Sequence, residues 1–339
     1  MLPPALEPSI SRRFKPASAN TTPSNYAAAE QHRDLLDDCD LNAYIEEHIL
    51  GAAVSIKPET LVGYQRAEFG KAATRRLWLF VLQLAIAVPA AASVLVTDEV
   101  WVYGLAISGF VLLVLWWVAF TTYQRTRNAA QSARRASLLI GGLGGELSPD
   151  ATLSFRRLMT VAEEEAATHE KADYYATSFP AGPARLGEMI EESAFYSAHL
   201  QRFSALAMLG ILVIFAIVFA GIAFAALPFI DEATTLTILR VFLALLVFGM
   251  SSDVLGAYLS HRSAARDIES VRSRLQLARR DNFPLVDVLL LMGDYNLAVE
   301  SAPESVPYAY DISEKRLNRL WAEYMENLRQ ISQKPLVKR

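Results

Sequence analysis

Four long apolar stretches, joined in pairs by short connectors, constrain this chain more than any other feature of its sequence. Each can supply the roughly 20 apolar residues that cross a hydrocarbon core about 30 Å thick. The stretches are residues 77–97, 100–124, 203–230 and 233–260, the last of which also carries Arg240 and Asp253. The sequence therefore predicts an all-α membrane protein with two transmembrane helical hairpins, 77–124 and 203–260.

Lys and Arg residues gather on one side of these stretches. The basic residues nearest to them are Lys71, Arg75, Arg76, Arg125, Arg127, Arg134, Arg135, Arg202, Arg262 and Arg266. The connectors on the other side contain only the acidic charges of Asp98, Glu99, Asp231 and Glu232. By the positive-inside rule, both termini and residues 125–202 are expected to be cytoplasmic, which makes this a multi-pass protein.

Helical patterns extend beyond the membrane on the cytoplasmic side. A helix is expected to begin at Pro58, since proline is favoured at a first helical position, and to run into the first span. After Phe120 and after Tyr258 the sequence stays compatible with a helix for about 20 residues, or about 30 Å, which predicts a helical stalk. The predicted cytoplasmic parts are a disordered tail at 1–24, helices within 25–76, a helical segment at 125–202, and the stalk with C-terminal helices at 261–339.

Two cytoplasmic segments have more detailed predictions. Residues 149–177 are expected to form one helix, and residues 303–307 a loop. A final helix is expected to start at Asp311, with Glu314 completing a capping box. Apolar residues recur in it at intervals of three and four, which predicts one buried face. These residues are Leu317, Leu320, Trp321, Tyr324, Leu328 and Ile331.

No catalytic or cofactor motif is complete in this sequence. The run from Gly141 to Gly145 lacks the Lys-Ser/Thr pair of a phosphate-binding loop. His169-Glu170 lacks the second histidine of a zinc protease helix. The single cysteine, Cys39, excludes a disulfide within the chain. With a net charge of −4, DNA and RNA polymers are not expected as partners. The chain is therefore predicted not to be an enzyme and to use no cofactor or metal.

Polar residues of the fourth stretch are candidates for lining a pore. Asp253, with Ser251 and Ser252, lies near its inner end, and ionisable residues at membrane depth usually face protein or water. Arg240 lies about 20 Å further along a helix. Two alternatives stay open. Asp253 could pair at the interface with Arg202 or Arg262, and Arg240 could pair with an outer acidic residue or extend toward the lipid headgroups.

A cytoplasmic segment between the hairpins is a candidate for binding a ligand. It contains Tyr174, Tyr175, Phe179 and Arg185. Aromatic faces and a guanidinium are suited to stacking on bases and to pairing with phosphate. The alternative is a loop that wedges the stalk helices against the membrane surface.

The hairpin order and a C-terminal pattern give a resemblance to a known family. The pattern is Tyr, Ala-Pro, Pro, Leu-Asn and Trp over residues 295–321, within GDYNLAVESAPESVPYAYDISEKRLNRLWAEY. With two hairpins and a helical segment between them, the chain from residue 25 to residue 330 resembles the four-transmembrane effectors associated with bacterial second-messenger nucleotidyltransferases in anti-phage defence. A recognisable nucleotide-binding module is not present in the sequence.

The resemblance implies a dormant protein of the bacterial inner membrane that a cyclic nucleotide or oligonucleotide signal switches to disruption of the lipid bilayer. It implies no binding residue, since no ligand motif of the family matches here. Four helices rarely enclose an ion path, so permeation would require a homo-oligomer with a ring of fourth spans. Two other functions remain open: a scaffold that docks a cytoplasmic partner through the apolar stripe of Trp321, and a small transporter.

Overall fold

The computed structural model describes residues 56–93, 96, 98–226 and 254–333, all within the second of two compact units, Ser55–Arg339. The elements among these residues are helices, with no strand. They are α3 (Pro58–Ala92), α4 (Glu99–Leu143), α5 (Pro149–Leu158), α6 (Glu163–Ala167), α7 (Pro183–Ala226), α9 (Leu255–Arg280), α10 (Leu285–Ser301) and α11 (Ala309–Gln333). The all-α prediction is thus confirmed for the described part. The predicted tail and the helical pattern before residue 56 lie outside it.

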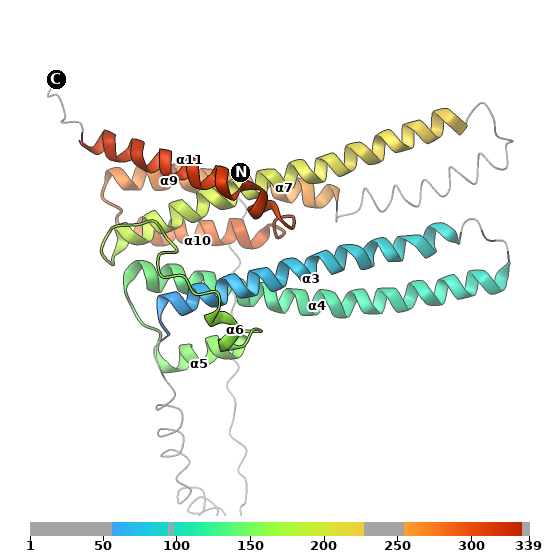
Figure 1. The fold of residues 1–339 in the computed structure, drawn as a ribbon, viewed down its shortest axis with the longest axis horizontal. Coiled ribbons are helices and arrows are strands. Elements are labelled where there is room, and N and C mark those ends of the chain that lie inside the picture. Colours follow the sequence, from blue (N-terminus) through green and yellow to red (C-terminus); the bar gives the residue numbers. More distant parts are fainter. Residues whose placement is uncertain (1–55, 94–95, 97, 227–253, 334–339) are drawn as a thin grey trace, which may run out of the picture. The chain divides into compact units, whose positions relative to one another are not determined.

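Two long helices, α3 and α4, form the first hairpin and lie side by side (Figure 1). α3 begins at Pro58 and continues without a break into its apolar segment, as predicted. α4 begins after Asp98, whose side chain caps the helix by accepting a hydrogen bond from the N–H of Val100 at 2.8 Å. It ends at Gly144, which has a φ of 77° and donates its N–H to the carbonyl of Ile140 at 2.9 Å. Glycine suits this left-handed cap because it has no Cβ to strain.

Three of the described helices are long and apolar enough to cross a membrane. The segments concerned are Pro58–Ala90 in α3, Glu99–Leu143 in α4 and Pro183–Val218 in α7. None of the residues in the most apolar part of α4 is buried, and Trp117 of this helix is 62% exposed. Large apolar side chains on an outer surface are expected of helices that contact lipid. Residues 233–253 of the fourth predicted stretch lie outside the described residues.

Residues 149–177 do not form the single helix that the sequence predicts. α5 and α6 are short, and no helix covers residues 168–182. The break is explained by Glu68 of α3, which is fully buried. Its carboxylate accepts hydrogen bonds from the hydroxyl of Thr160 at 2.7 Å and from the N–H of Val161 at 2.9 Å. The free energy of these hydrogen bonds to a buried charge exceeds the small differences in helix propensity on which the prediction for residues 149–177 is based.

The largest hydrophobic core lies among α7, α9 and α10, with the end of α4 against it. Ile190, Ile268 and Tyr295 are at most 1% exposed in this core. The turn between α9 and α10 brings Phe283 against Gly187 of α7. A Cβ on Gly187 would lie 2.4 Å from the Phe283 ring, so this close approach requires glycine.

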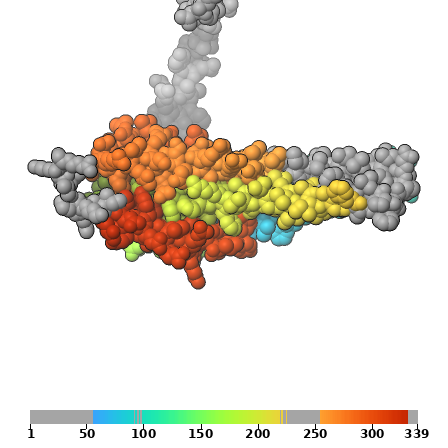
Figure 2. Space-filling view, turned by 90° about the horizontal axis from the view of Figure 1, so that it is seen from above, coloured from blue at the N-terminus to red at the C-terminus, as the bar shows by residue number. Residues whose placement is uncertain are grey.

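α11 packs on α7 through its predicted apolar stripe, and Figure 2 shows the two helices along one face of the molecule. Leu317 and Trp321 are buried, and the rings of Trp321 and Phe195 have centroids 5.2 Å apart. The helix starts at Ala309 rather than at Asp311, which lies in its first turn. The predicted loop at residues 303–307 is confirmed.

The first half of the described chain (α3–α6) meets the second half (α7, α9, α10 and α11) where the end of α4 contacts the start of α7. A Cβ on Gly142 would lie 2.8 Å from Leu186, so glycine is required at this crossing. The N–H of Gly182 also donates to the carbonyl of Gly142 at 2.8 Å. Between this crossing and the apolar segments, the two halves are separated by a cavity.

Candidate ligand-binding cavity

The cavity between the two halves has a volume of about 950 Å³. Side chains of α3 and α4 form one wall and side chains of α7, α10 and α11 form the other, while residues 171–176 cover one side. Pockets for small molecules commonly have volumes of roughly 300–1,000 Å³. The cavity is therefore large enough for an organic ligand that contacts both halves at once.

Five tyrosines line this cavity: Tyr174, Tyr175, Tyr196, Tyr295 and Tyr310. Tyr174 and Tyr175 pack edge to face, with centroids 4.9 Å apart and planes at 87°. Burial raises the pKa of Tyr174 to about 12, so its hydroxyl keeps its proton at neutral pH. Burial also raises the pKa of Tyr175, whose hydroxyl lies near Ser137 and Ser193.

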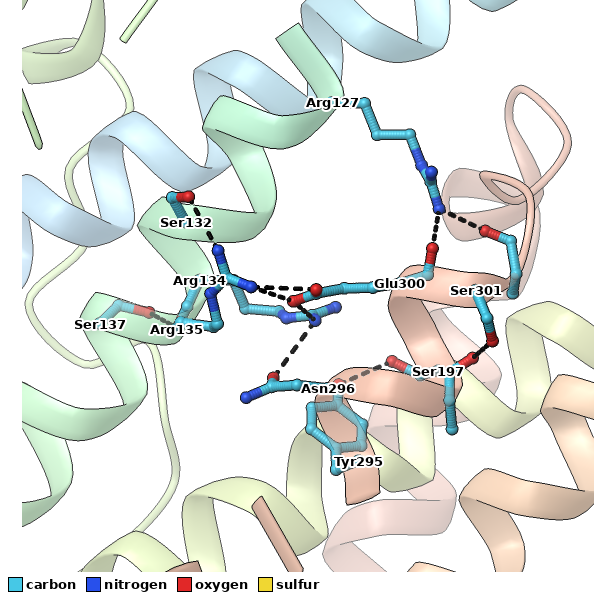
Figure 3. A network of polar contacts seen from close by, with 12 residues as sticks. Arg127, Ser132, Arg134, Arg135, Ser137, Ser197, Tyr295, Asn296, Glu300 and Ser301 are labelled. Atoms are coloured by element: carbon cyan, nitrogen blue, oxygen red, sulfur yellow. Dashed lines mark hydrogen bonds and ion pairs between the residues drawn. The ribbon is translucent and has the colours of Figure 1, made fainter. Parts of the chain in front are cut away.

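Arginines of α4 reach across to Glu300 of α10 (Figure 3). Nη1 of Arg135 lies 3.0 Å from both carboxylate oxygens of Glu300. Nη2 of Arg134 lies 3.5 Å from the same carboxylate. Arg127 donates through Nη2 to the backbone carbonyls of Glu300 at 2.6 Å and Ala302 at 2.5 Å. One carboxylate thus serves two guanidinium groups.

Arg134 is the buried member of this cluster, with a side chain only 5% exposed. Its guanidinium carbon lies 5.2 Å from the centre of the Tyr295 ring, a cation–π contact. Its polar contacts are long: Glu300 at 3.5 Å and the side-chain oxygen of Asn296 at 3.4 Å. Its Nε has no hydrogen-bond partner among the described residues. A buried charge with such weak partners is costly, and an anionic ligand would supply the missing interactions.

Five carboxyl groups also line the cavity: Asp173, Glu192, Glu304, Glu314 and Glu326. Glu192 of α7 accepts a hydrogen bond from the N–H of Ala176 at 2.9 Å, and burial raises its pKa to about 7. Glu304 follows α10, and its Oε2 lies 3.9 Å from Nε of Arg127. Burial raises the pKa of Glu304, and the nearby arginines oppose that rise. A protonated Glu192 can donate a hydrogen bond, so the lining offers donors as well as acceptors.

Around Arg134 and the tyrosines, the lining suits a ligand with a planar ring and an anionic group. Tyrosine faces stack on rings, and a guanidinium forms strong hydrogen bonds with phosphate or carboxylate. A metal-dependent mode of binding has no support in the described residues, where no cluster of His, Cys, Asp and Glu could hold a metal ion.

Two of the four residues that the sequence singles out for ligand binding line the cavity. These are Tyr174 and Tyr175, whereas Phe179 and Arg185 do not line it. Arg185 donates through Nη1 to the carbonyl of Phe179 at 3.1 Å, so this pair closes the turn before α7. The turn lies next to Gly142, near the end of α4 that is furthest from its apolar segment.

The residues predicted to line a pore lie outside the described part of the chain. They are Arg240, Ser251, Ser252 and Asp253. The basic residues considered as alternative partners of Asp253 have other contacts. Arg202 forms an ion pair with Glu269 at 3.1 Å, and Arg262 donates to the Tyr258 hydroxyl at 3.2 Å.

Sequence reasoning missed the arginine face of α4. It assigns Arg127 and Arg134 to the positive-inside signal, together with their basic neighbours. Helical spacing distinguishes Arg127 and Arg134 from these neighbours. Arg127, Gln131 and Arg134 are spaced by four and three residues and therefore share one face of the helix. That face lines the cavity, whereas Arg125 is exposed. The spacing is a usable signal, but Glu300 lies 173 residues from Arg127, and no local pattern predicts their contact.

Comparisons of the chain with protein-family models, with curated proteins and with solved structures give no match. Each half of the described chain contributes one wall, so a bound ligand would contact both.

Proposed function

We propose that this protein is a membrane effector of bacterial anti-phage defence that binds a nucleotide second messenger in this cavity, assembles and permeabilises the inner membrane. The observation that carries the proposal is the position of the cavity. Its walls come from both halves of the chain, and α3, α4 and α7 continue from it into apolar segments. A ligand that contacts both walls favours whichever arrangement of the hairpins it binds more tightly.

A nucleotide matches the chemistry of the lining. Its base would stack on the tyrosines, and its phosphate would pair with Arg134. The present contacts of Arg134 with Glu300 and Asn296 are long, and Glu300 is shared with Arg135. A cyclic nucleotide or an oligonucleotide is the form that the family resemblance implies. In this proposal the two hairpins and the cytoplasmic cavity belong to a four-span protein with cytoplasmic termini.

Permeation in this proposal requires several copies of the chain, with the fourth predicted span along the water path. An outward face of α10 supports self-association. Leu290 is 61% exposed and Leu297 is 71% exposed, which is unusual for leucines outside the apolar segments.

The scaffold alternative loses the docking site that the sequence suggests for it. Trp321 is 5% exposed and packs on Phe195, so its stripe already has an intramolecular partner. A partner protein would have to displace α11 from α7 to reach that stripe. The effector function is therefore the one that we retain.

Dye-loaded liposomes that contain the inserted protein test the proposal. Cyclic dinucleotides of adenine and of guanine are the probes, and we expect at least one of them to cause leakage. Arg134→Gln should raise the concentration needed for half-maximal leakage by roughly 10- to 100-fold, because a hydrogen bond to a charged group is worth about 1.5–3 kcal/mol.

Arg125→Gln is the matched control, since it removes the same charge from an exposed position of the same helix. It should respond like the wild type, and thermal midpoints of both variants would reveal any loss of folding. No leakage with any cyclic dinucleotide, from protein shown to be inserted, would refute the effector function. Equal responses of the two variants would refute the role of Arg134.

A further inference from the structure

The linker between α10 and α11, residues 302–308, touches two different parts of the structure. Its first residues line the cavity, among them Pro303 and Glu304. Further along, Val306 packs against a separate apolar cluster formed by Met208 of α7 with Val254 and Ala257 at the start of α9. The same short segment therefore contacts both the cavity and the junction of α7 with α9.

Side chains from two helices hold the linker in this position. Arg127 of α4 binds its start through the carbonyl of Ala302 at 2.5 Å. Gln201 of α7 donates to the carbonyl of Pro303 at 3.3 Å, and Ser204 accepts the N–H of Val306 at 3.0 Å. Tyr308 has a φ of 63°, a conformation that costs a bulky residue free energy. The conformation is thus imposed by these contacts rather than by local preference.

Glu304 supplies a negative charge beside Arg127 in the cavity wall. Its side chain is 11% exposed, and its Oε2 lies 3.9 Å from Nε of Arg127 with no hydrogen-bond partner among the described residues. Burial raises the pKa of Glu304, while the nearby arginines and a hydrogen bond with Tyr123 oppose that rise. A ligand anion that binds Arg127 more strongly than Glu304 does would compete with it for this position.

Val306 lies where α7 and α9 come together, beside the apolar segment of α7. Met208 belongs to the apolar segment of α7 that is long enough to span a membrane. Val254 and Ala257 lie within the inner end of the fourth predicted span, 233–260. Removing Val306 from this cluster would leave space between α7 and α9, which the two helices would refill by changing their contact.

We propose that the linker couples the cavity to the membrane-directed helices: an anionic ligand replaces Glu304 beside Arg127, the linker leaves the cavity wall, and Val306 withdraws from between α7 and α9. Two negative groups cannot share this position, since like charges at short range repel strongly in a low-dielectric site. Without ligand, Glu304 supplies the negative charge and the linker holds the resting arrangement. The link to membrane permeabilisation rests on the proposed function, whereas the movement of the linker does not.

Thiol labelling tests the movement with a simple anion, inorganic pyrophosphate. The full chain in detergent carries Cys39→Ser and Val306→Cys, and the labelling rate is measured with and without the anion. We expect pyrophosphate to raise the rate by at least about fivefold, the lower end of typical coupling between sites. Leu285→Cys, at an exposed position of α10, is the control and should label at the same rate in both conditions. An unchanged rate at position 306 overturns the proposal.

Leakage without ligand provides the second test. Glu304→Gln weakens the attachment of the linker and should raise spontaneous leakage from liposomes severalfold over the wild type. Asp311→Asn removes the same charge from an exposed position in the first turn of α11 and should leave leakage unchanged.

The two proposals fail in different ways. If pyrophosphate exposes position 306 but no cyclic dinucleotide causes leakage, the linker coupling stands and the effector function falls. If cyclic dinucleotides cause leakage while position 306 and Glu304→Gln behave like their controls, the effector function stands and the coupling falls.

Discussion

Buried charges in this chain fall into two kinds, which differ in how completely they are paired. Glu191 is fully buried, but it binds Arg279 at 2.6 Å and the hydroxyl of Tyr324. Glu68 is equally buried and accepts several hydrogen bonds from the segment after α5. Arg134 has only long contacts although its side chain is almost fully buried. The well-paired charges hold the fold together, while the poorly paired one marks the cavity as a place for a ligand.

Glu192 gives the cavity wall a pH-dependent stability. Burial raises its pKa to about 7 from an ordinary 4.5, so the folded protein keeps a proton there that the unfolded chain releases. The stabilisation is complete below about pH 4.5 and is lost as the pH rises through about 7.

Glu192→Gln stays neutral and should therefore be more stable than the wild type at about pH 8, by roughly 1–3 kcal/mol, with a difference that closes toward about pH 5. Thermal midpoints over this range measure it. Glu323→Gln, on the exposed face of α11, is the control and should not change the pH dependence. A constant difference between Glu192→Gln and the wild type at all pH values would contradict the prediction.

The helix α11 is attached to α7 by an apolar cluster and by Tyr324. Leu317 and Trp321 pack on Phe195, and the hydroxyl of Tyr324 donates to Glu191. Because α11 also supplies part of the cavity wall, its attachment to α7 determines whether the cavity is complete.

Trp321→Ala should lower the free energy of unfolding of the helical body by about 3–5 kcal/mol, the usual cost of truncating a buried tryptophan. The thermal midpoint in detergent should fall accordingly. Arg319→Ala, whose side chain is 72% exposed on the same helix, should change it little. Equal midpoints for wild type and Trp321→Ala would mean that α11 does not pack on α7 in solution.

For the whole molecule, the predicted orientation in the membrane can be tested directly. In a Cys39→Ser background, single cysteines replace Asp98, Glu165 or Glu232. Positions 98 and 232 should react with a membrane-impermeant thiol reagent in spheroplasts, and position 165 should react only after lysis, because Lys and Arg lie on the inner side. Labelling of position 165 alone in intact spheroplasts would reverse the topology.

Local signals predicted the elements of the fold far better than its contacts. Pro58 marks a predicted helix start that agrees with α3, and the predicted extension of about 20 residues after Phe120 agrees with the end of α4 at Leu143. The break between α5 and α6 depends on Glu68, a residue about 90 positions away, so the pattern of residues 149–177 could not reveal it.

The candidate site was predictable only in part, for the same reason. Tyr174 and Tyr175 are adjacent aromatic residues and could be recognised from a short segment. Arg134 becomes a ligand-binding candidate only once its burial and its long contacts with Glu300 and Asn296 are known. Those contacts depend on how the two halves of the chain pack together.

The glycine crossing between α4 and α7 makes α4 a lever. At about 1.5 Å per residue, Gly142 lies roughly 12 Å from Arg134 and roughly 65 Å from Glu99 at the opposite end of the helix. With the crossing as its fulcrum, a displacement of about 1 Å at Arg134 becomes about 5 Å at the far end, by the ratio of these lengths. That is about half of the 8–10 Å that separates the axes of packed helices. A shift smaller than a side chain at the cavity would thus move the far end of α4 by about half the distance between two packed helices.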